Sequence, residues 1–211
     1  MWFQLLSSVV AVLICALSVP QTAWSQERTT VVVPSTTAPR VPPLDKGSVE
    51  GKTYKNATLG LELTVAPHLE LGAPELKGTA GTVPLLVTVA AWGPKKWFSS
   101  REGTIFYADA LAYYPEGLRS TDDYVRKVIR ANQPEGFEPV DVAEGAKLSK
   151  IAGVSFARVD FRKGTVYEAV LVKACKAFAL VFIFPGPDLE TINKLTATTQ
   201  LKLDSSAGCA K

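Results

Sequence analysis

The fold of this chain is decided by residues 147–184, which read KLSKIAGVSFARVDFRKGTVYEAVLVKACKAFALVFIF. Apolar segments alternate here with very short turns, which is typical of an antiparallel meander. The pattern predicts four strands, at 147–151, 154–161, 165–173 and 177–184. The last of them lacks polar alternation altogether, so we expect both of its faces to be buried. A sheet that contains this strand needs a packed layer on each side.

Further strands are predicted on both sides of the meander. In residues 59–65, leucine or valine alternates with polar residues and glycine, which indicates a strand with one face on a core. A second stretch is apolar on both faces, and a third has a poorer pattern. The predicted strands outside the meander are therefore 59–65, 83–92, 104–110 and 200–203.

Two helices are predicted between these strands. Ser120 precedes a threonine and two aspartates, which is typical of a helix start, and the helix should end near Asn132 because Pro134 follows. A second helix follows Asp188 and places Leu189, Ile192 and Leu195 on one face. The chain therefore combines one antiparallel sheet with two helices, and we expect an α+β fold.

The N-terminal residues predict export. Residues 1–25 carry no charged side chain, hold a continuous apolar stretch from Leu5 to Val19, and end in Ala23-Trp24-Ser25. This stretch is short for a membrane span, and small residues occupy the positions that a signal peptidase requires. We expect cleavage after Ser25 and a periplasmic or secreted protein with no transmembrane segment in the mature chain; the alternative is an uncleaved membrane anchor.

The rest of the chain divides into three parts. Residues 26–48 are rich in proline and threonine, and proline stiffens the chain and removes backbone donors, so a solvated linker is expected. Residues 49–204 form one domain, large enough to bury a core. Residues 205–211 form a C-terminal tail.

Three features of this domain carry a family resemblance. They are the pattern Tyr54-x-x-x-x-Leu59-Gly60-Leu61-x-Leu63, the turn Ile151-Ala152-Gly153, and the run from Phe178 through the second helix to Leu201-Lys202-Leu203. Over residues 54–203 the chain resembles the PsbP and Mog1-like family, in an exported, bacterial type. The resemblance implies an α/β/α sandwich, an antiparallel β-sheet flanked by helices, used as an accessory or binding module. It carries over no site residue.

One stretch of the domain combines aromatic rings with cations. Such a surface suits glycans, peptides or anionic headgroups, because rings supply contact area and cations supply charge. The alternative is that the rings pack against the edge of the sheet. The candidate ligand-binding residues are Trp92, Lys95, Lys96, Trp97, Phe98, Arg101 and Tyr107.

Cys175 and Cys209 are the two cysteines of the expected mature chain. Cys175 lies in the predicted turn of the last hairpin, so it is not explained as a core residue. After export the pair can close a disulfide, which would contribute roughly 3 to 4 kcal/mol for a loop of about 35 residues. The alternative is two free thiols.

Composition and motifs disfavour several classes of function. The net charge is only +3 with scattered cations, so no nucleic-acid partner is expected. The single histidine, His68, follows a strand end without a nucleophile signature, so we predict a solvated loop residue, no catalytic residue and no enzyme. Metal-ligand clusters and glycine-rich phosphate loops are missing, which predicts no metal and no cofactor.

The sequence therefore predicts an exported, non-catalytic accessory or binding module that acts in the cell envelope or outside the cell. Its expected partner is a protein or an envelope component, and the oligomeric state is left open. Two alternatives remain: an envelope hydrolase with an unrecognised nucleophile, and a purely structural or assembly protein.

Overall fold

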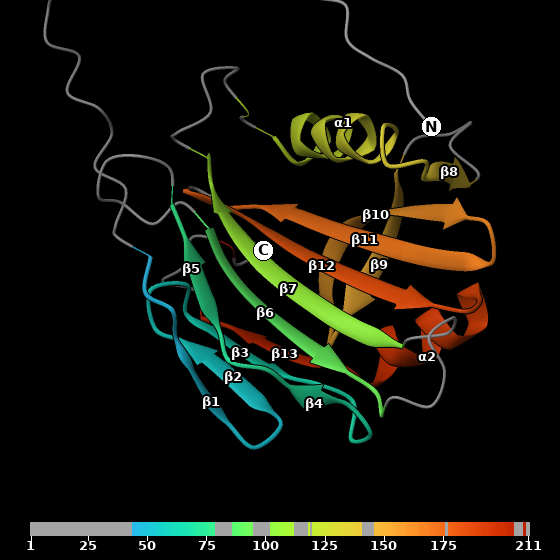
Figure 1. Cartoon of the computed structure of the whole chain (residues 1–211). Coiled ribbons are helices and arrows are strands. Elements are labelled where there is room, and N and C mark those ends of the chain that lie inside the picture. Colours follow the sequence, from blue (N-terminus) through green and yellow to red (C-terminus); the bar gives the residue numbers. More distant parts are fainter. Residues whose placement is uncertain are drawn as a thin grey trace, which may run out of the picture. The chain divides into compact units, whose positions relative to one another are not determined.

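The computed structural model describes residues 44–78, 86–94, 102–111, 118, 120–140, 146–175, 177–204 and 209. All of them belong to one compact unit, Ala38–Lys211 (Figure 1). Of the described residues, 53% lie in strands and 17% in helices. The domain already includes Leu44, which is 3% exposed and belongs to the main core, so ordered packing begins N-terminal to residue 49.

The expected α+β sandwich, with one sheet flanked by helices, is wrong. The described part of the chain is mostly β and contains two antiparallel sheets and two helices. The small sheet has the strand order β1 (Ser48–Glu50), β2 (Thr53–Asn56), β3 (Leu61–Thr64) and β13 (Gln200–Leu203). The large sheet has the order β4 (Glu70–Leu71), β6 (Leu86–Trp92), β7 (Gly103–Ala110), β12 (Phe178–Gly186), β11 (Val166–Ala174), β10 (Val154–Lys163) and β8 (Glu138–Val140), with β5 (Glu75–Lys77) also on β6 and β9 (Lys147–Ile151) also on β10.

The predicted meander is confirmed as β9, β10, β11 and β12, each antiparallel to the next. The turn between β9 and β10 has two residues, Ala152 and Gly153, with φ of +47° and +86°. Positive φ at both positions is typical of the type I′ turn, whose twist matches that of the flanking strands. This short turn fixes the pairing of Ile151 with Val154.

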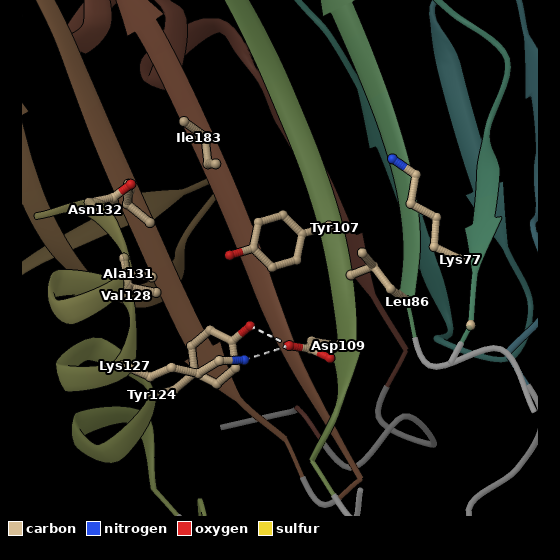
Figure 2. A pocket seen from close by; sticks show the side chains of 12 residues that line it. Lys77, Leu86, Tyr107, Asp109, Tyr124, Lys127, Val128, Ala131, Asn132 and Ile183 are labelled. Atoms are coloured by element: carbon tan, nitrogen blue, oxygen red, sulfur yellow. Dashed lines mark hydrogen bonds and ion pairs between the residues drawn. The ribbon is translucent and has the colours of Figure 1, made fainter. Parts of the chain in front are cut away.

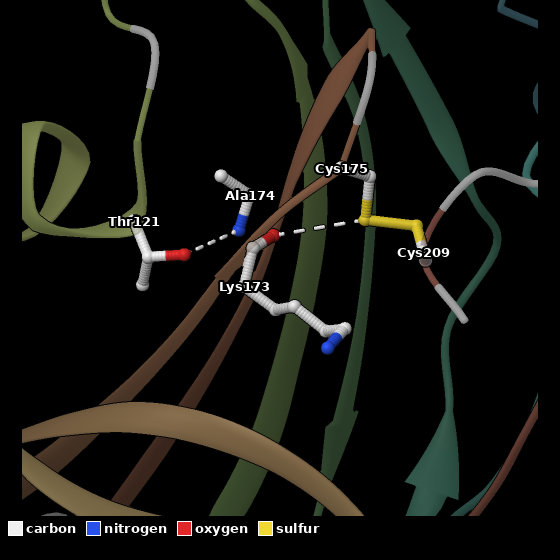
Figure 3. The surroundings of a disulfide bond; sticks show 5 residues. All are labelled: Thr121, Lys173, Ala174, Cys175 and Cys209. Carbon is white, nitrogen blue, oxygen red and sulfur yellow. Dashed lines mark hydrogen bonds between the residues drawn. A yellow bond between two sulfur atoms is a disulfide. The ribbon is translucent and has the colours of Figure 1, made fainter. Parts of the chain in front are cut away.

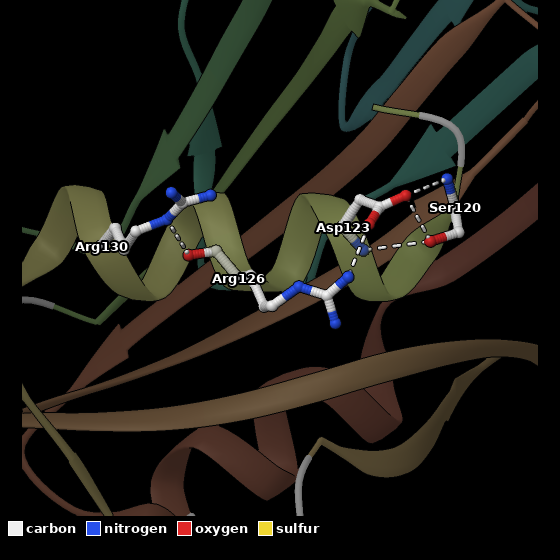
Figure 4. Close-up of polar contacts among 4 residues, drawn as sticks. All are labelled: Ser120, Asp123, Arg126 and Arg130. Atoms are coloured by element: carbon white, nitrogen blue, oxygen red, sulfur yellow. Dashed lines mark hydrogen bonds and ion pairs between the residues drawn. The ribbon is translucent and has the colours of Figure 1, made fainter. Parts of the chain in front are cut away.

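Helix α1 (Thr121–Asn132) covers one face of the large sheet, as Figure 1 shows. Its predicted start and end are both confirmed. The Ser120 side chain accepts from the Asp123 N–H at 3.1 Å, and the Asp123 carboxylate accepts from the Ser120 N–H in return (Figure 4). Arg126 donates to the other oxygen of Asp123 at 2.6 Å, which adds a cation to the acidic first turn. This capping box satisfies amide groups that the helix itself leaves without partners.

The opposite face of the large sheet packs on the small sheet and on helix α2 (Leu189–Thr198). At the centre of this core, the ring centroids of Phe106 and Phe182 lie 5.0 Å apart, and those of Phe156 and Phe182 lie 5.4 Å apart. Ile192 of α2 and Leu201 of β13 belong to the same apolar cluster. One layer that was expected to be helical is therefore largely a second sheet.

The reason for the wrong fold class lies in two predicted strands. The strands at 59–65 and 200–203 were expected in the main sheet, but as β3 and β13 they pair with each other, Leu63 opposite Leu201. Alternation shows that a strand has one buried face, but it does not show which neighbour that strand has. The resulting small sheet stacks its apolar face on the large one.

A disulfide joins Cys175 to Cys209, with the two Cα atoms 4.6 Å apart (Figure 3). Cys175 is 8% and Cys209 5% exposed, and both belong to the main core, so the expectation that Cys175 would not be a core residue is wrong. Next to this bond, the Ala174 N–H donates to the Thr121 hydroxyl at 3.1 Å, which ties the start of α1 to the end of β11.

Candidate functional site

A pocket of about 380 Å³ lies between α1 and the large sheet (Figure 2). Six elements contribute to it: β5, β6, β7, α1 and the paired strands β11 and β12. The lining residues are Lys77, Gly78, Leu86, Tyr107, Asp109, Tyr124, Lys127, Val128, Ala131, Asn132, Val170 and Ile183.

The alternation of β7 decides which of its residues reach the pocket. Phe106 and Ala108 point into the main core, so Tyr107 and Asp109 point to the opposite face, toward α1. Leu86 is the cross-strand partner of Asp109 and therefore lies on the same face. The sheet thus places a phenol, a carboxylate and an apolar side chain next to one another.

The carboxylate of Asp109 is the most buried charge of the pocket, at 5% exposure. Its Oδ2 accepts a hydrogen bond from the Tyr124 hydroxyl at 2.7 Å and from the Lys127 ammonium at 3.1 Å. Tyr124 and Lys127 are three positions apart on the helix, so both project from the same side of α1. A buried charge needs such partners, because removal from water costs several kcal/mol.

Lys127 also lies over an aromatic ring. Its ammonium is 4.8 Å from the centroid of the Tyr124 ring, and its side chain is 29% exposed. The cation is therefore held by a carboxylate and by a π face at once. This fixes the ammonium at the polar end of the pocket.

The two pocket tyrosines hold their protons tightly. Burial raises the pKa of Tyr107 to about 12. Burial, together with the neighbouring Tyr107 and Asp109, raises the pKa of Tyr124 as well. Both phenols are therefore neutral hydrogen-bonding groups at physiological pH.

The remaining walls are largely apolar. They come from the sheet and from the C-terminal half of α1, and they consist of Leu86, Val128, Ala131, Val170 and Ile183. Lys77 and Asn132 add polar groups; the Lys77 ammonium is 3.5 Å from the Glu75 carboxylate and is largely exposed. The pocket therefore has one polar end, around Asp109, and an apolar body.

The predicted ligand-binding residues fall into three groups. Tyr107 lines the pocket. Trp92 lies on the same face of β6 as Leu86 but packs over Gly103, where an added Cβ would come within 2.5 Å of the indole ring. Lys95, Lys96, Trp97, Phe98 and Arg101 lie outside the described residues, so a surface built from all seven stays a prediction.

Sequence reasoning missed Asp109, Tyr124 and Lys127. Asp109 could have been recognised from the sequence as a candidate site residue, because aspartate is rare inside strands and needs a partner there. Tyr124 was predicted to lie on the apolar face of the helix, but its hydroxyl was not given a role. Lys127 carries no signal of its own; only the packing of α1 on β7 brings it to Asp109.

His68 lies apart from the pocket lining. Its Nε2 is 3.1 Å from a Glu102 oxygen, and its side chain is 50% exposed. In the described part of the chain, histidine, cysteine and acidic side chains do not form a cluster of three or more that could hold a metal.

Comparisons with known proteins give no match: none of the protein-family models, curated proteins or solved structures is similar to this chain. The resemblance to the PsbP and Mog1-like family stays an expectation. Across the residues described, neither helix has the length and apolar character to cross a membrane.

Proposed function

We propose that this chain is an exported binding module that holds a small, largely apolar ligand in the pocket between α1 and the large sheet. The observation that carries the proposal is the pocket itself, with apolar walls around one polar cluster, Tyr107, Asp109, Tyr124 and Lys127. Sites for small ligands have this composition and volumes of about 300–1,000 Å³. The apolar segment from Leu5 to Val19 supports a site of action in the periplasm or outside the cell.

The polar groups of the pocket favour binding over proton-transfer catalysis. A general acid or base works best with a pKa near the operating pH, and burial raises the pKa of Tyr107 to about 12. The Asp109 carboxylate is hydrogen-bonded by Tyr124 and Lys127. Groups held in this way orient a ligand more readily than they exchange protons with it.

An accessory role fits the same module. The resemblance to the PsbP and Mog1-like family favours a partner that is a protein or an envelope component, and the low net charge of +3 disfavours a nucleic acid. The ligand would then be recognised by this module on behalf of that partner.

The test is a fragment screen on the mature domain by ligand-observed NMR, with two matched helix variants. Ala131→Phe puts a ring into the pocket from the exposed side of α1. Arg130→Phe adds the same ring one position earlier, at a residue that does not line the pocket. We expect pocket fragments to bind at least about 10-fold more weakly to Ala131→Phe and normally to Arg130→Phe. Equal binding to both variants would contradict the proposal.

A further inference from the structure

Strand β9 lies at an edge of the large sheet. Among the described residues it pairs only with β10, from Ile151 opposite Val154 to Lys147 opposite Arg158. Since β10 occupies one side of β9, the backbone groups on the other side face no strand of the described chain. Such an edge can accept a further strand, which binds through its own N–H and C=O groups.

The turn between β9 and β10 decides which residues point their backbone groups outward. In a two-residue type I′ hairpin, the residues that flank the turn form a hydrogen-bonded pair, here Ile151 with Val154. Hydrogen-bonded and non-hydrogen-bonded pairs alternate along an antiparallel ladder, so Ser149 also bonds to β10. Leu148 and Lys150 take the alternate positions, and their N–H and C=O groups therefore point away from β10.

The side chains of the same two residues are exposed. Leu148 is 84% exposed, whereas Leu76, the other exposed large apolar residue of the described chain, is 39% exposed. Leu148 belongs to neither apolar cluster of the domain. Lys150 is also exposed and lies two positions further along the strand, on the same face. The outer edge of β9 thus offers an apolar contact and a cation next to each other.

Positive charge is concentrated on the hairpin of β9 and β10. Residues 147–163 carry five cations and one acidic residue, a net charge of +4, whereas the whole chain carries +3. The charged residues are Lys147, Lys150, Arg158, Asp160, Arg162 and Lys163. Arg158 is ion-paired with Asp160 at 2.7 Å, so the excess charge is positive. It attracts a strand with acidic side chains, whereas a second copy of β9 would bring its own lysines to this edge.

We propose that β9 is a docking edge for an extended segment of a partner protein, with an acidic residue opposite Lys150 and an apolar residue opposite Leu148. Side chains opposite each other lie on one face, so the two partner residues are two positions apart. In antiparallel pairing the acidic residue comes first, because the partner runs against β9. The residues of β9 do not line the pocket, so this inference does not depend on the ligand site.

The experiment uses two peptides that differ at one position, acetyl-Thr-Thr-Glu-Thr-Val-Thr-Thr-amide and the same peptide with Lys in place of Glu. Each is titrated into the mature domain at low ionic strength while NMR follows the backbone amides. We expect the glutamate peptide to bind at least about 3-fold more tightly, because opposite charges attract and like charges repel across strands. The amide protons of Leu148 and Lys150 should become protected from exchange, whereas that of Ser149 should change little.

Three variants assign this preference to β9. Lys150→Glu should reverse it, so that the lysine peptide binds more tightly. Lys202→Glu makes the same change on β13, an edge strand of the small sheet, and the preference should persist. Leu148→Ser should weaken the binding of both peptides and leave the free energy of unfolding unchanged, because the Leu148 side chain is exposed.

Several results would overturn this inference. They are equal binding of the two peptides, failure of both peptides to affect the β9 amides, and a preference that survives Lys150→Glu. Protection of the Leu148 and Lys150 amides without any peptide would also overturn it. Protection that rises with protein concentration would identify a second copy as the occupant, and protection at every concentration would identify another segment of this chain. None of these results affects the pocket, which the fragment screen tests separately.

Discussion

At the scale of single residues, the pocket depends on a buried charge that two side chains of one helix stabilise. Asp109 lies in a strand, where a carboxylate is unfavourable by itself, and α1 supplies the hydroxyl and the ammonium that it needs. Neither partner is near Asp109 in the sequence. This is why the pattern of residues 104–110 predicted a strand correctly but gave no indication of a site.

Lys127→Met should reduce the free energy of unfolding by about 2 to 3 kcal/mol at neutral pH, because it leaves the Asp109 carboxylate without its ammonium. The double variant Asp109→Asn with Lys127→Met should recover part of this loss, because the buried charge is then gone. Urea denaturation of the two single variants and the double variant gives the coupling energy. Additive effects would show that the ion pair does not stabilise the fold.

Thr104 is a second informative residue. Thr104 is 1% exposed, and within the described residues its buried hydroxyl has no hydrogen-bond partner. Thr104→Val removes the hydroxyl and keeps the shape, so it should raise the free energy of unfolding by about 1 kcal/mol. Thr196→Val is the control, because the buried Thr196 hydroxyl donates to the Ile192 carbonyl at 2.9 Å and its loss should not stabilise. A destabilised Thr104→Val would mean that this hydroxyl is hydrogen-bonded.

At the scale of elements, sequence patterns were reliable where apolar residues were numerous. The four strands of the meander and helix α1 begin and end close to their predicted residues. Each of these segments contains enough apolar residues to show its own pattern in the sequence. Five short strands, β1, β2, β4, β5 and β8, were not predicted. Glu75–Lys77, for example, has three exposed residues, so its pairing with β6 leaves no hydrophobic pattern.

The turn between β9 and β10 gives a prediction at this scale. Ala152 has a φ of +47°, in the left-handed region that L-residues other than asparagine and aspartate rarely adopt. Ala152→Asn should raise the free energy of unfolding by about 0.5 to 1 kcal/mol, because Asn-Gly is the preferred pair of a type I′ turn. Thermal unfolding measures it, and Gly153→Ala, which adds a Cβ at φ +86°, should be destabilising. A less stable Ala152→Asn variant would rule out this turn type.

At the scale of the whole molecule, two β-sheets and α2 share one core, and α1 closes the other face of the large sheet. The sequence predicted the burial of both faces of 177–184 but not what covers each one. The pairing of β3 with β13 joins residues about 140 positions apart in the sequence. Local periodicity predicts that each segment is a strand, but it does not predict which strand pairs with it.

The disulfide adds a constraint at the same scale. Cys175 and Cys209 are 34 residues apart, and their bond closes the segment that contains β12, α2 and β13. Replacing both cysteines by alanine should reduce the free energy of unfolding by about 3 to 4 kcal/mol, because the unfolded chain gains freedom. Guanidinium denaturation of the oxidised wild type and the double variant measures the difference. A change below about 1 kcal/mol would show that the bond adds little to stability.

The central claim is that the space between α1 and the large sheet is a ligand site. The most direct measurement is a crystal structure of the mature domain soaked with a fragment that binds in the NMR screen. The account predicts density for the fragment inside the pocket, against Leu86, Val128 and Ile183. An empty pocket at saturating concentration, or a compound bound elsewhere on the domain, would contradict it.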